Sequence, residues 1–168
     1  MRDLCKYKKE TYIFDKEFGP IYRIRDKQTN QKFQAEILRH KIKNSKTSEL
    51  FSFSREGKLL SKLNHPSIQK FFEYSSVDFE QKAKPLIITE YTSRGTLKSI
   101  LNRPSSFLKL DDTKKLIILY GIAKGMSFLH SNGIIHCCLN PNSVLINDKY
   151  QPKISNFMMS RHININSN

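Results

Sequence analysis

Three consecutive residues, His136, Cys137 and Cys138, bring together side chains that proteins use as nucleophiles and as soft-metal ligands. A thiol beside an imidazole is the pattern of an activated nucleophile, and thiols combined with imidazoles bind zinc. Adjacent side chains point away from each other, however, and no second Cys/His cluster supplies further ligands. The pattern therefore favours a structural histidine beside two ordinary thiols, and no metal site is predicted.

Cysteine usage and hydropathy indicate the compartment. Cys5 and the adjacent pair at 137–138 form neither a disulfide framework nor a C-x-x-C spacing, which agrees with a reducing environment. No apolar run approaches the roughly 18 residues of a membrane span, and the N-terminus lacks the apolar stretch of a secretory signal. We therefore expect a soluble, cytoplasmic protein.

The formal charge of +14 raises nucleic acid or an anionic membrane surface as partners. The basic residues are scattered from Arg2 to Arg161, and the densest groups, at 6–9 and 39–43, contain no run of five or six. This distribution favours a solvated basic surface over a nucleic-acid site. The sequence names neither a protein partner nor an oligomeric state.

The elements that position these residues begin with short apolar runs rich in Ile, Phe and Tyr over residues 12–38. Turn residues interrupt the runs at 19–20 and again at the polar cluster 26–30. Such a pattern predicts three antiparallel strands joined by two turns.

A helix and two more strands are expected next. Leucines at helical spacing predict a helix over 48–63, which ends before Pro66 because proline disfavours helix in the residue ahead of it. Residues 71–74 and 86–90 are apolar enough to form two further strands, the second of them buried.

Near residues 91–95 the sequence pattern changes from short apolar runs, typical of strands, to helical spacing, and we expect a lobe boundary there. A helix is predicted over 111–131, because a carboxylate-rich start precedes apolar residues at three and four spacing. The stripe expected to form core comprises Leu116, Leu119, Ile122, Ala123, Met126 and Leu129. A loop is expected over 133–160 and a frayed tail over 161–168.

This order of elements, with several of its segments, resembles the protein kinase family. Thr89-Glu90-Tyr91 resembles the hinge with a threonine gatekeeper. Residues 63–68 resemble the segment that joins helix αC to the next strand, and residues 128–136 resemble the approach to the catalytic loop.

The resemblance covers residues 10–160 and implies an α+β, protein-kinase-like fold. It implies a five-stranded antiparallel N-lobe sheet with helix αC over about 10–91, and a partial, mainly helical C-lobe over about 92–160. Kinase C-lobes bury the 111–131 helix against later helices that this chain does not contain, so we expect it to expose a contiguous apolar face.

The family's Gly-rich loop falls on residues 14–21, where only the third glycine, Gly19, remains. Phe14 and Lys16 replace glycines that let backbone N–H groups approach phosphates. Gln34 stands where the family keeps a small alanine against the adenine. The resemblance thus implies a degenerate nucleotide pocket at Gly19, Ile21, Gln34, Thr89, Glu90, Tyr91 and Leu145.

The family's third-strand lysine is replaced by Glu36, whereas its αC glutamate is retained as Glu56. Two carboxylates at about 4 Å repel each other by roughly 4 kcal/mol if the effective dielectric is about 20. We therefore expect Glu36 and Glu56 not to touch unless one is protonated or a cation lies between them.

The catalytic loop departs furthest from the family pattern. Cys138 stands at the general-base aspartate, Asn140 at the lysine that contacts the γ-phosphate, and Ser143 at the asparagine that binds magnesium. Asn156 replaces the metal-binding aspartate of D-F-G, and Cys137 replaces the arginine that meets an activation-loop phosphate. The resemblance implies that Mg²⁺, which prefers carboxylate and phosphate oxygens, is not bound.

These substitutions predict a pseudokinase, inactive in phosphoryl transfer, that acts as a binding or scaffold module in signalling. No cofactor is required, ATP binding is weak at most, and Glu56 and His136 keep structural roles. One alternative is a working kinase in which Lys16 supplies the missing lysine, as in kinases of the with-no-lysine type. A non-functional kinase fragment is the other.

Overall fold

The computed structural model describes residues 4–40, 47–103 and 110–163. The chain divides into two compact units. The first unit comprises Met1–Lys62 and Lys70–Tyr91, and the second comprises Leu63–Gln69 and Thr92–Asn168. The first unit contains Lys16, Glu36 and Glu56, and the second contains His136 and the catalytic-loop positions that follow it.

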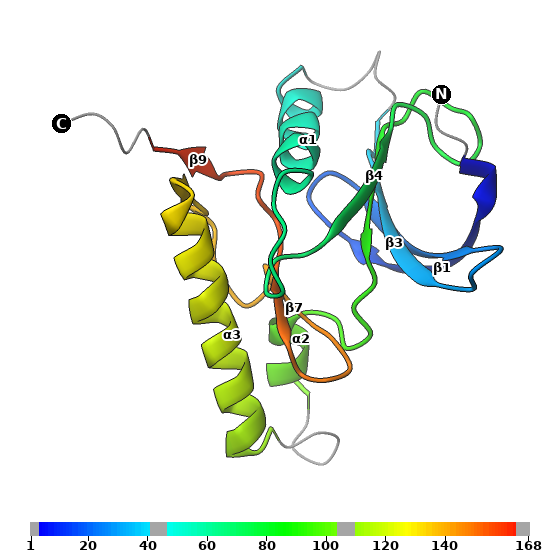
Figure 1. The fold of residues 1–168 in the computed structure, drawn as a ribbon. Helices are drawn as coiled ribbons and strands as arrows, with labels where there is room; N and C mark the ends of the chain where they lie inside the picture. Colours follow the sequence, from blue (N-terminus) through cyan, green and yellow to red (C-terminus); the bar gives the residue numbers. More distant parts are fainter. Residues whose placement is uncertain (1–3, 41–46, 104–109, 164–168) are drawn as a thin grey trace. The chain divides into compact units, whose positions relative to one another are not determined.

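A five-stranded sheet, ordered β1-β2-β3-β5-β4, forms the first unit, and every neighbouring pair of strands is antiparallel. The strands are β1 (Tyr7–Asp15), β2 (Pro20–Asp26), β3 (Lys32–Ile37), β4 (Phe71–Ser75) and β5 (Leu86–Glu90), preceded by the short 3-10 helix η1 (Leu4–Lys6). Helix α1 (Thr47–Leu60) lies beside the sheet and contacts β4 (Figure 1). The expected sheet is confirmed.

The turn between β2 and β3 is made by the polar cluster at 26–30. The Asp26 carboxylate accepts hydrogen bonds from the backbone N–H groups of Gln28 and Thr29, at 2.9 and 2.8 Å. Asn30 has φ of +61°, a left-handed conformation that asparagine tolerates better than most residues. Local side-chain chemistry therefore fixes this turn where the sequence predicts it.

Alternation along β3 divides its side chains between the two faces of the sheet. Phe33, Ala35 and Ile37 belong to the apolar core on one face, whose buried members are Leu4, Tyr7, Ile24, Phe33, Ala35, Ile37, Leu86 and Ile88. Gln34 and Glu36 point to the opposite face and are nevertheless buried. Buried polar side chains need hydrogen-bond or charge partners, so we expect such partners on this face of the sheet.

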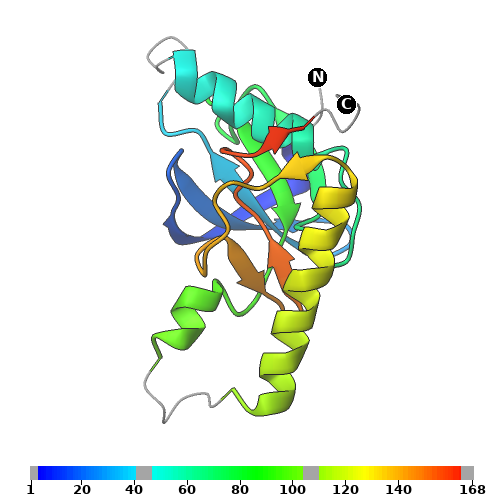
Figure 2. The same ribbon diagram turned by 90° about the vertical axis from the view of Figure 1, so that its left-hand side faces the viewer.

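The second unit combines two helices with two small sheets. Its elements are α2 (Leu97–Leu101), α3 (Asp112–Ser131), β6 (Ile134–Ile135), β7 (Val144–Ile146), β8 (Pro152–Ile154) and β9 (Arg161–His162). The β7–β8 hairpin lies alongside α3 (Figure 2). Asp111 caps α3, because its carboxylate accepts a hydrogen bond from the Lys114 N–H at 2.8 Å.

Two sequence predictions for this unit are wrong in part. The segment 133–160 contains β6, β7 and β8 and is not simply a loop. Residues 161–163 are also not frayed, because β9 pairs with β6 and the Ile163 N–H donates to the Gly133 carbonyl at 2.7 Å. Strands of two or three residues have too short a pattern to predict. The remainder of the predicted tail, 164–168, lies outside the described residues.

The apolar stripe of α3 is also buried differently from the prediction. Leu116 and Leu119, expected in the core, are 67% and 65% exposed, whereas Ile118 and Leu129 are buried. Apolar residues occur on more than one side of α3, so their spacing alone does not identify the packed face. The exposed apolar side chains of α3 are Leu116, Ile117, Leu119 and Tyr120. Within the described residues, no helix is long and apolar enough to cross a membrane.

Candidate functional site

A lysine from the turn between β1 and β2 lies between two buried carboxylates in the first unit. Lys16 Nζ is 2.9 Å from Glu36 Oε2 and 4.0 Å from Glu56 Oε1. Glu36 is 8% exposed and Glu56 only 3%. We call these three residues the buried triad. A cation thus separates the two carboxylates, as their repulsion requires.

Packing of Gly19 explains how Lys16 reaches this position. The Lys16 N–H donates to the Gly19 carbonyl at 2.9 Å and closes the turn. A Cβ on Gly19 would lie 2.1 Å from the Ile37 carbonyl oxygen and 2.9 Å from the Arg39 backbone nitrogen. Only glycine lets the turn approach the end of β3 so closely. The one retained glycine of the loop therefore has a packing role.

Burial and charge act on the triad in opposite directions. Burial raises the pKa of Glu36, and the Glu56 carboxylate adds to that rise, whereas Lys16 opposes it. Burial would lower the pKa of Lys16, but the two carboxylates hold it above its usual range, so the ammonium stays charged. Glu36 Oε1 is buried with no hydrogen-bond partner among the described residues. One ammonium facing two carboxylates leaves a surplus of negative charge.

Glu36→Gln tests this electrostatic account through the pH dependence of stability. The raised pKa of Glu36 means that its stabilising contribution is complete below the ordinary glutamate pKa and is lost as pH rises through the folded value. The free energy of unfolding of the parent should therefore fall relative to Glu36→Gln between about pH 4 and pH 7. Urea unfolding across this range measures the difference. Glu49→Gln, in the first turn of α1, is the matched control. A gap for Glu36→Gln that does not change with pH would contradict the account.

The sequence indicated Lys16 only as a substitute phosphate ligand, and its ion pair with Glu36 was not predicted. One signal was available. Lys16 stands where the family pattern has a glycine, and Glu36 stands where it has a lysine, so the two departures from the pattern carry opposite charges.

Strand register gathers part of the predicted nucleotide pocket on the face that carries Glu36. Ile21 lies opposite Glu36, and Gln34 lies opposite Thr89. Directly opposed residues of antiparallel strands point to the same face, so these four side chains share it. Glu90 lies opposite Phe33 on the other face, and its carboxylate accepts from the Lys70 N–H at 2.8 Å.

Two further predicted pocket positions are Tyr91 and Leu145. Tyr91 is half-buried at the end of the first unit, and Leu145 is buried on β7 of the second unit. The first unit alone therefore brings together Ile21, Gln34 and Thr89, where the long Gln34 side chain occupies space that an alanine would leave open.

In the second unit, both ring nitrogens of His136 bind backbone groups. Nδ1 accepts the Cys138 N–H at 3.2 Å, and Nε2 lies 2.9 Å from the Ser155 carbonyl oxygen. A carbonyl oxygen cannot donate, so this geometry assigns the neutral tautomer with its proton on Nε2. The ring also packs on Phe157, with 4.9 Å between centroids. No ring nitrogen is left to activate a thiol, which supports the structural interpretation of His136.

The degenerate loop positions form one hydrogen-bonded turn. Ser143 Oγ donates to the Asn140 carbonyl and accepts from the Asn140 N–H, both at 2.9 Å. Asn140 Nδ2 donates to the Cys138 carbonyl at 2.9 Å. The Ser155 N–H donates to the Ser143 carbonyl at 2.8 Å, which brings Asn156 beside the turn. Cys138, Asn140, Ser143 and Asn156 are thus assembled in one place.

Two non-glycine residues of this region have left-handed backbones, Cys137 with φ of +59° and Asn156 with φ of +66°. Such conformations are costly for residues with a Cβ and cluster at functional sites. The left-handed backbone is therefore strained at Cys137, whereas the asparagine at 156 tolerates it better than most residues.

The side chains in this turn do not fit Mg²⁺. A thiol, two amides and a hydroxyl stand at the four positions, and none of them is a carboxylate. Mg²⁺ is a hard cation that takes carboxylate and phosphate oxygens in octahedral geometry. In the part of the chain that the structure describes, no group of three or more His, Cys, Asp or Glu could hold a metal ion.

A five-stranded antiparallel sheet with a helix after its third strand, and a second unit with a histidine-anchored loop after a long helix, define a protein-kinase-like fold. The comparison of families agrees. The chain belongs to the protein tyrosine and serine/threonine kinase family, whose model matches residues 8–168.

Several curated kinases are similar to this chain. Serine/threonine-protein kinase CTR1 of Arabidopsis thaliana is 34% identical over 111 residues, which is 65% of this chain and 13% of the relative. Serine/threonine/tyrosine-protein kinase HT1 of the same plant is 37% identical over 108 residues, 62% of this chain and 26% of the relative. Tyrosine-protein kinase receptor svh-2 of Caenorhabditis elegans is 32% identical over 124 residues, 74% of this chain and 11% of the relative. The chain thus spans about a quarter or less of the length of these relatives.

Proposed function

We propose that this chain is a pseudokinase module, comprising about residues 10–160, that binds a protein partner and does not transfer phosphate. One observation carries the proposal. The turn that assembles Cys138, Asn140, Ser143 and Asn156 contains no carboxylate and no ammonium, although its backbone is held in a specific, strained shape. Kinase catalysis consists of positioning and charge stabilisation, so a neutral turn lacks the groups that do the work.

The electrostatics of the buried triad support the same proposal. Lys16 is engaged by Glu36 and Glu56, and the three together carry surplus negative charge. ATP phosphates are themselves strongly negative and are repelled by such a cluster. With Gln34 on the same face of the sheet, we expect at most weak ATP binding that does not depend on Mg²⁺.

A working kinase is the second candidate, and one distance favours it. Lys16 Nζ reaches Glu56, the carboxylate that pairs with the third-strand lysine in the family pattern, at 4.0 Å. This arrangement would supply one missing charge. It leaves the base and both metal positions neutral, and the loss of several members of a catalytic unit lowers rates by powers of ten.

A thermal-shift titration separates the two candidates. The pseudokinase predicts that ATP raises the melting temperature by about 2 °C or less, because a ligand near its Kd stabilises by only about 0.4 kcal/mol, and that Mg²⁺ adds nothing. A Mg²⁺-dependent rise of several degrees, together with phosphate transfer by the parent chain, would establish the working kinase instead.

A further inference from the structure

The residues that join β1 to β2, 16–19, direct two of their side chains into the first unit, although turns of this kind usually lie on the surface. Lys16 places its ammonium in the buried triad, and Phe18 is only 7% exposed. The Phe18 ring meets the ring of Phe53 on α1 edge to face, with 5.7 Å between the centroids. We call residues 16–19 the strap, because they fasten the turn to β3 and to α1.

Backbone and surface contacts close the strap against the segment that follows β3. The Arg39 N–H donates to the Phe18 carbonyl at 2.8 Å. The Arg39 guanidinium also lies 3.4 Å from the Asp15 carboxylate, but both side chains are half-exposed, so this ion pair contributes little. The strap is therefore held by its inward-pointing side chains and by one hydrogen bond whose opening the Arg39 amide can report.

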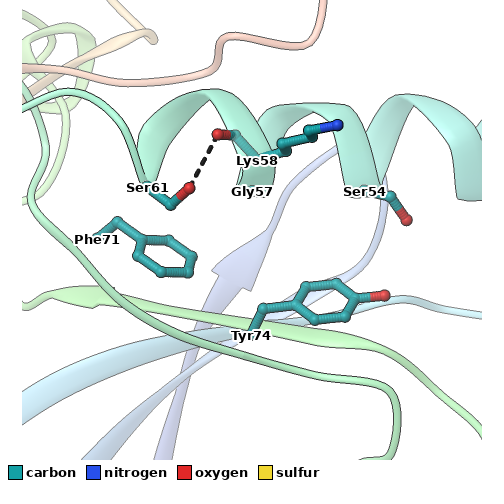
Figure 3. A pocket seen from close by; sticks show the side chains of 6 residues that line it. All are labelled: Ser54, Gly57, Lys58, Ser61, Phe71 and Tyr74. Atoms are coloured by element: carbon teal, nitrogen blue, oxygen red, sulfur yellow. Dashed lines mark hydrogen bonds between the residues drawn. The ribbon is translucent and has the colours of Figure 1, made fainter.

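Helix α1 is a fixed anchor for the strap, because it also packs on the sheet. Gly57, one turn after Phe53, lies so close to the sheet that a Cβ there would be 3.2 Å from Ile87 Cδ1. Figure 3 shows the rings of Phe71 and Tyr74 facing this part of the helix. Since β4 and β5 hold α1, the strap is the part that moves when Phe18 and Phe53 separate.

The contacts of Lys16 oppose the binding of anions to the first unit. Its ammonium lies against Glu36, on the sheet face that Glu36 shares with Gln34 and Thr89. While the two carboxylates of the triad hold this charge, a phosphate group on the same face has to compete with them. Burial raises the pKa of Glu36, so a Glu36 that loses Lys16 takes up a proton, and the release is less costly.

We propose that the strap is an autoinhibitory element, which keeps Lys16 on Glu36 and Glu56 and thereby hinders the binding of polyphosphate ligands such as ATP at this face. The inference rests on the proposed function and deepens it, because weak ATP binding then has a cause in the first unit that is separate from the neutral turn of the second. Opening the strap separates Phe18 from Phe53 and frees the ammonium to meet a phosphate.

Two neighbouring amides report separately on the strap and on the segment beside it. The Arg39 N–H is bonded to Phe18, whereas the Leu38 N–H donates to the Pro85 carbonyl at 2.8 Å, outside the strap. In Phe18→Ala, we expect hydrogen exchange measured by NMR to become at least about tenfold faster at Arg39 and less than about threefold faster at Leu38. Equal acceleration of both amides would mean general destabilisation and would contradict a strap that opens on its own.

Fluorescence titration of the full chain with trinitrophenyl-ATP, without Mg²⁺, tests the inhibition itself. Phe18→Ala should bind this probe about fivefold more tightly than the parent, whereas the affinity for trinitrophenyl-adenosine, which has no phosphates, should change less than about twofold. Tyr12→Ala removes an exposed aromatic ring from β1 and is the matched control, with no gain for either probe. A gain for neither probe in Phe18→Ala, or an equal gain for both, would overturn the proposal.

Phe18→Leu provides the test if Phe18→Ala does not fold. Leucine keeps an apolar side chain in place but loses the ring contact with Phe53, so the Arg39 amide should exchange about threefold faster and the ATP probe should bind about twofold more tightly. No gain in either measurement would overturn the proposal.

These outcomes are distinct from those that test the pseudokinase. Phosphate transfer by the parent chain would refute the pseudokinase whether or not the strap opens. A chain that transfers no phosphate, and whose Phe18 variants bind the ATP probe no more tightly, would refute the strap alone.

Discussion

Lys16→Met is expected to lower the free energy of unfolding by about 3–4 kcal/mol near neutral pH, because it leaves Glu36 and Glu56 buried without a cation. The loss has an upper bound. One carboxylate can take up a proton, which costs about 1.4 kcal/mol for each pH unit above the ordinary glutamate pKa, or about 4 kcal/mol at neutral pH. Urea unfolding of the variant and the parent measures the change.

A second substitution distinguishes this charge effect from lost packing. In Lys16→Met combined with Glu36→Lys, the ammonium returns from β3 to face Glu56, and most of the stability should be recovered. Lys32→Met removes an exposed lysine of the same unit and should change stability by less than about 0.5 kcal/mol. The triad account would be wrong if Lys16→Met were as mild as Lys32→Met, or if Glu36→Lys deepened the loss.

The sheet could be predicted from the sequence because its signals are local. The boundaries expected for β5 are those observed, and Asp26 fixes a turn through hydrogen bonds within its own segment. Asp111 likewise caps α3 at the expected position. In each case, the chemistry that defines the element lies within a few residues of it, so a pattern in the sequence is sufficient.

Long-range packing could not be predicted in the same way. The contact of Lys16 with Glu36 depends on the close approach of Gly19 to the Ile37 carbonyl, which no local pattern encodes. The exposure of Leu116 is another example, since the spacing of apolar residues does not reveal which of them meet β8. The sequence indicated that Lys16 and Glu36 are unusual for the family. Only the fold showed that their side chains form an ion pair.

Restoring three side chains in the second unit should create the Mg²⁺ dependence that we expect the parent chain to lack. The variant combines Cys138→Asp, Ser143→Asn and Asn156→Asp, which returns hard oxygen ligands to a turn that the structure already assembles. ATP at 100 times its Kd would stabilise this variant by about 2.7 kcal/mol, which corresponds to about 5–10 °C in a chain of this size. Thermal-shift titration with ATP, with and without Mg²⁺, measures the effect.

The matched control is the pair Cys138→Asn and Ser143→Asn, which leaves Asn156 unchanged, so it alters side-chain volume without adding a carboxylate. It should remain as insensitive to Mg²⁺ as the parent. In the proposed pseudokinase, the backbone at Cys137 and Asn156 already has the required shape, and only the negative charge of the metal-binding side chains is missing. A control that adds no carboxylate therefore should not respond to Mg²⁺. If the melting temperature of the restored variant did not depend on Mg²⁺, the weak ATP binding would be attributed to Gln34 and the buried triad. Carboxylates added in the second unit do not reduce the negative charge of the triad.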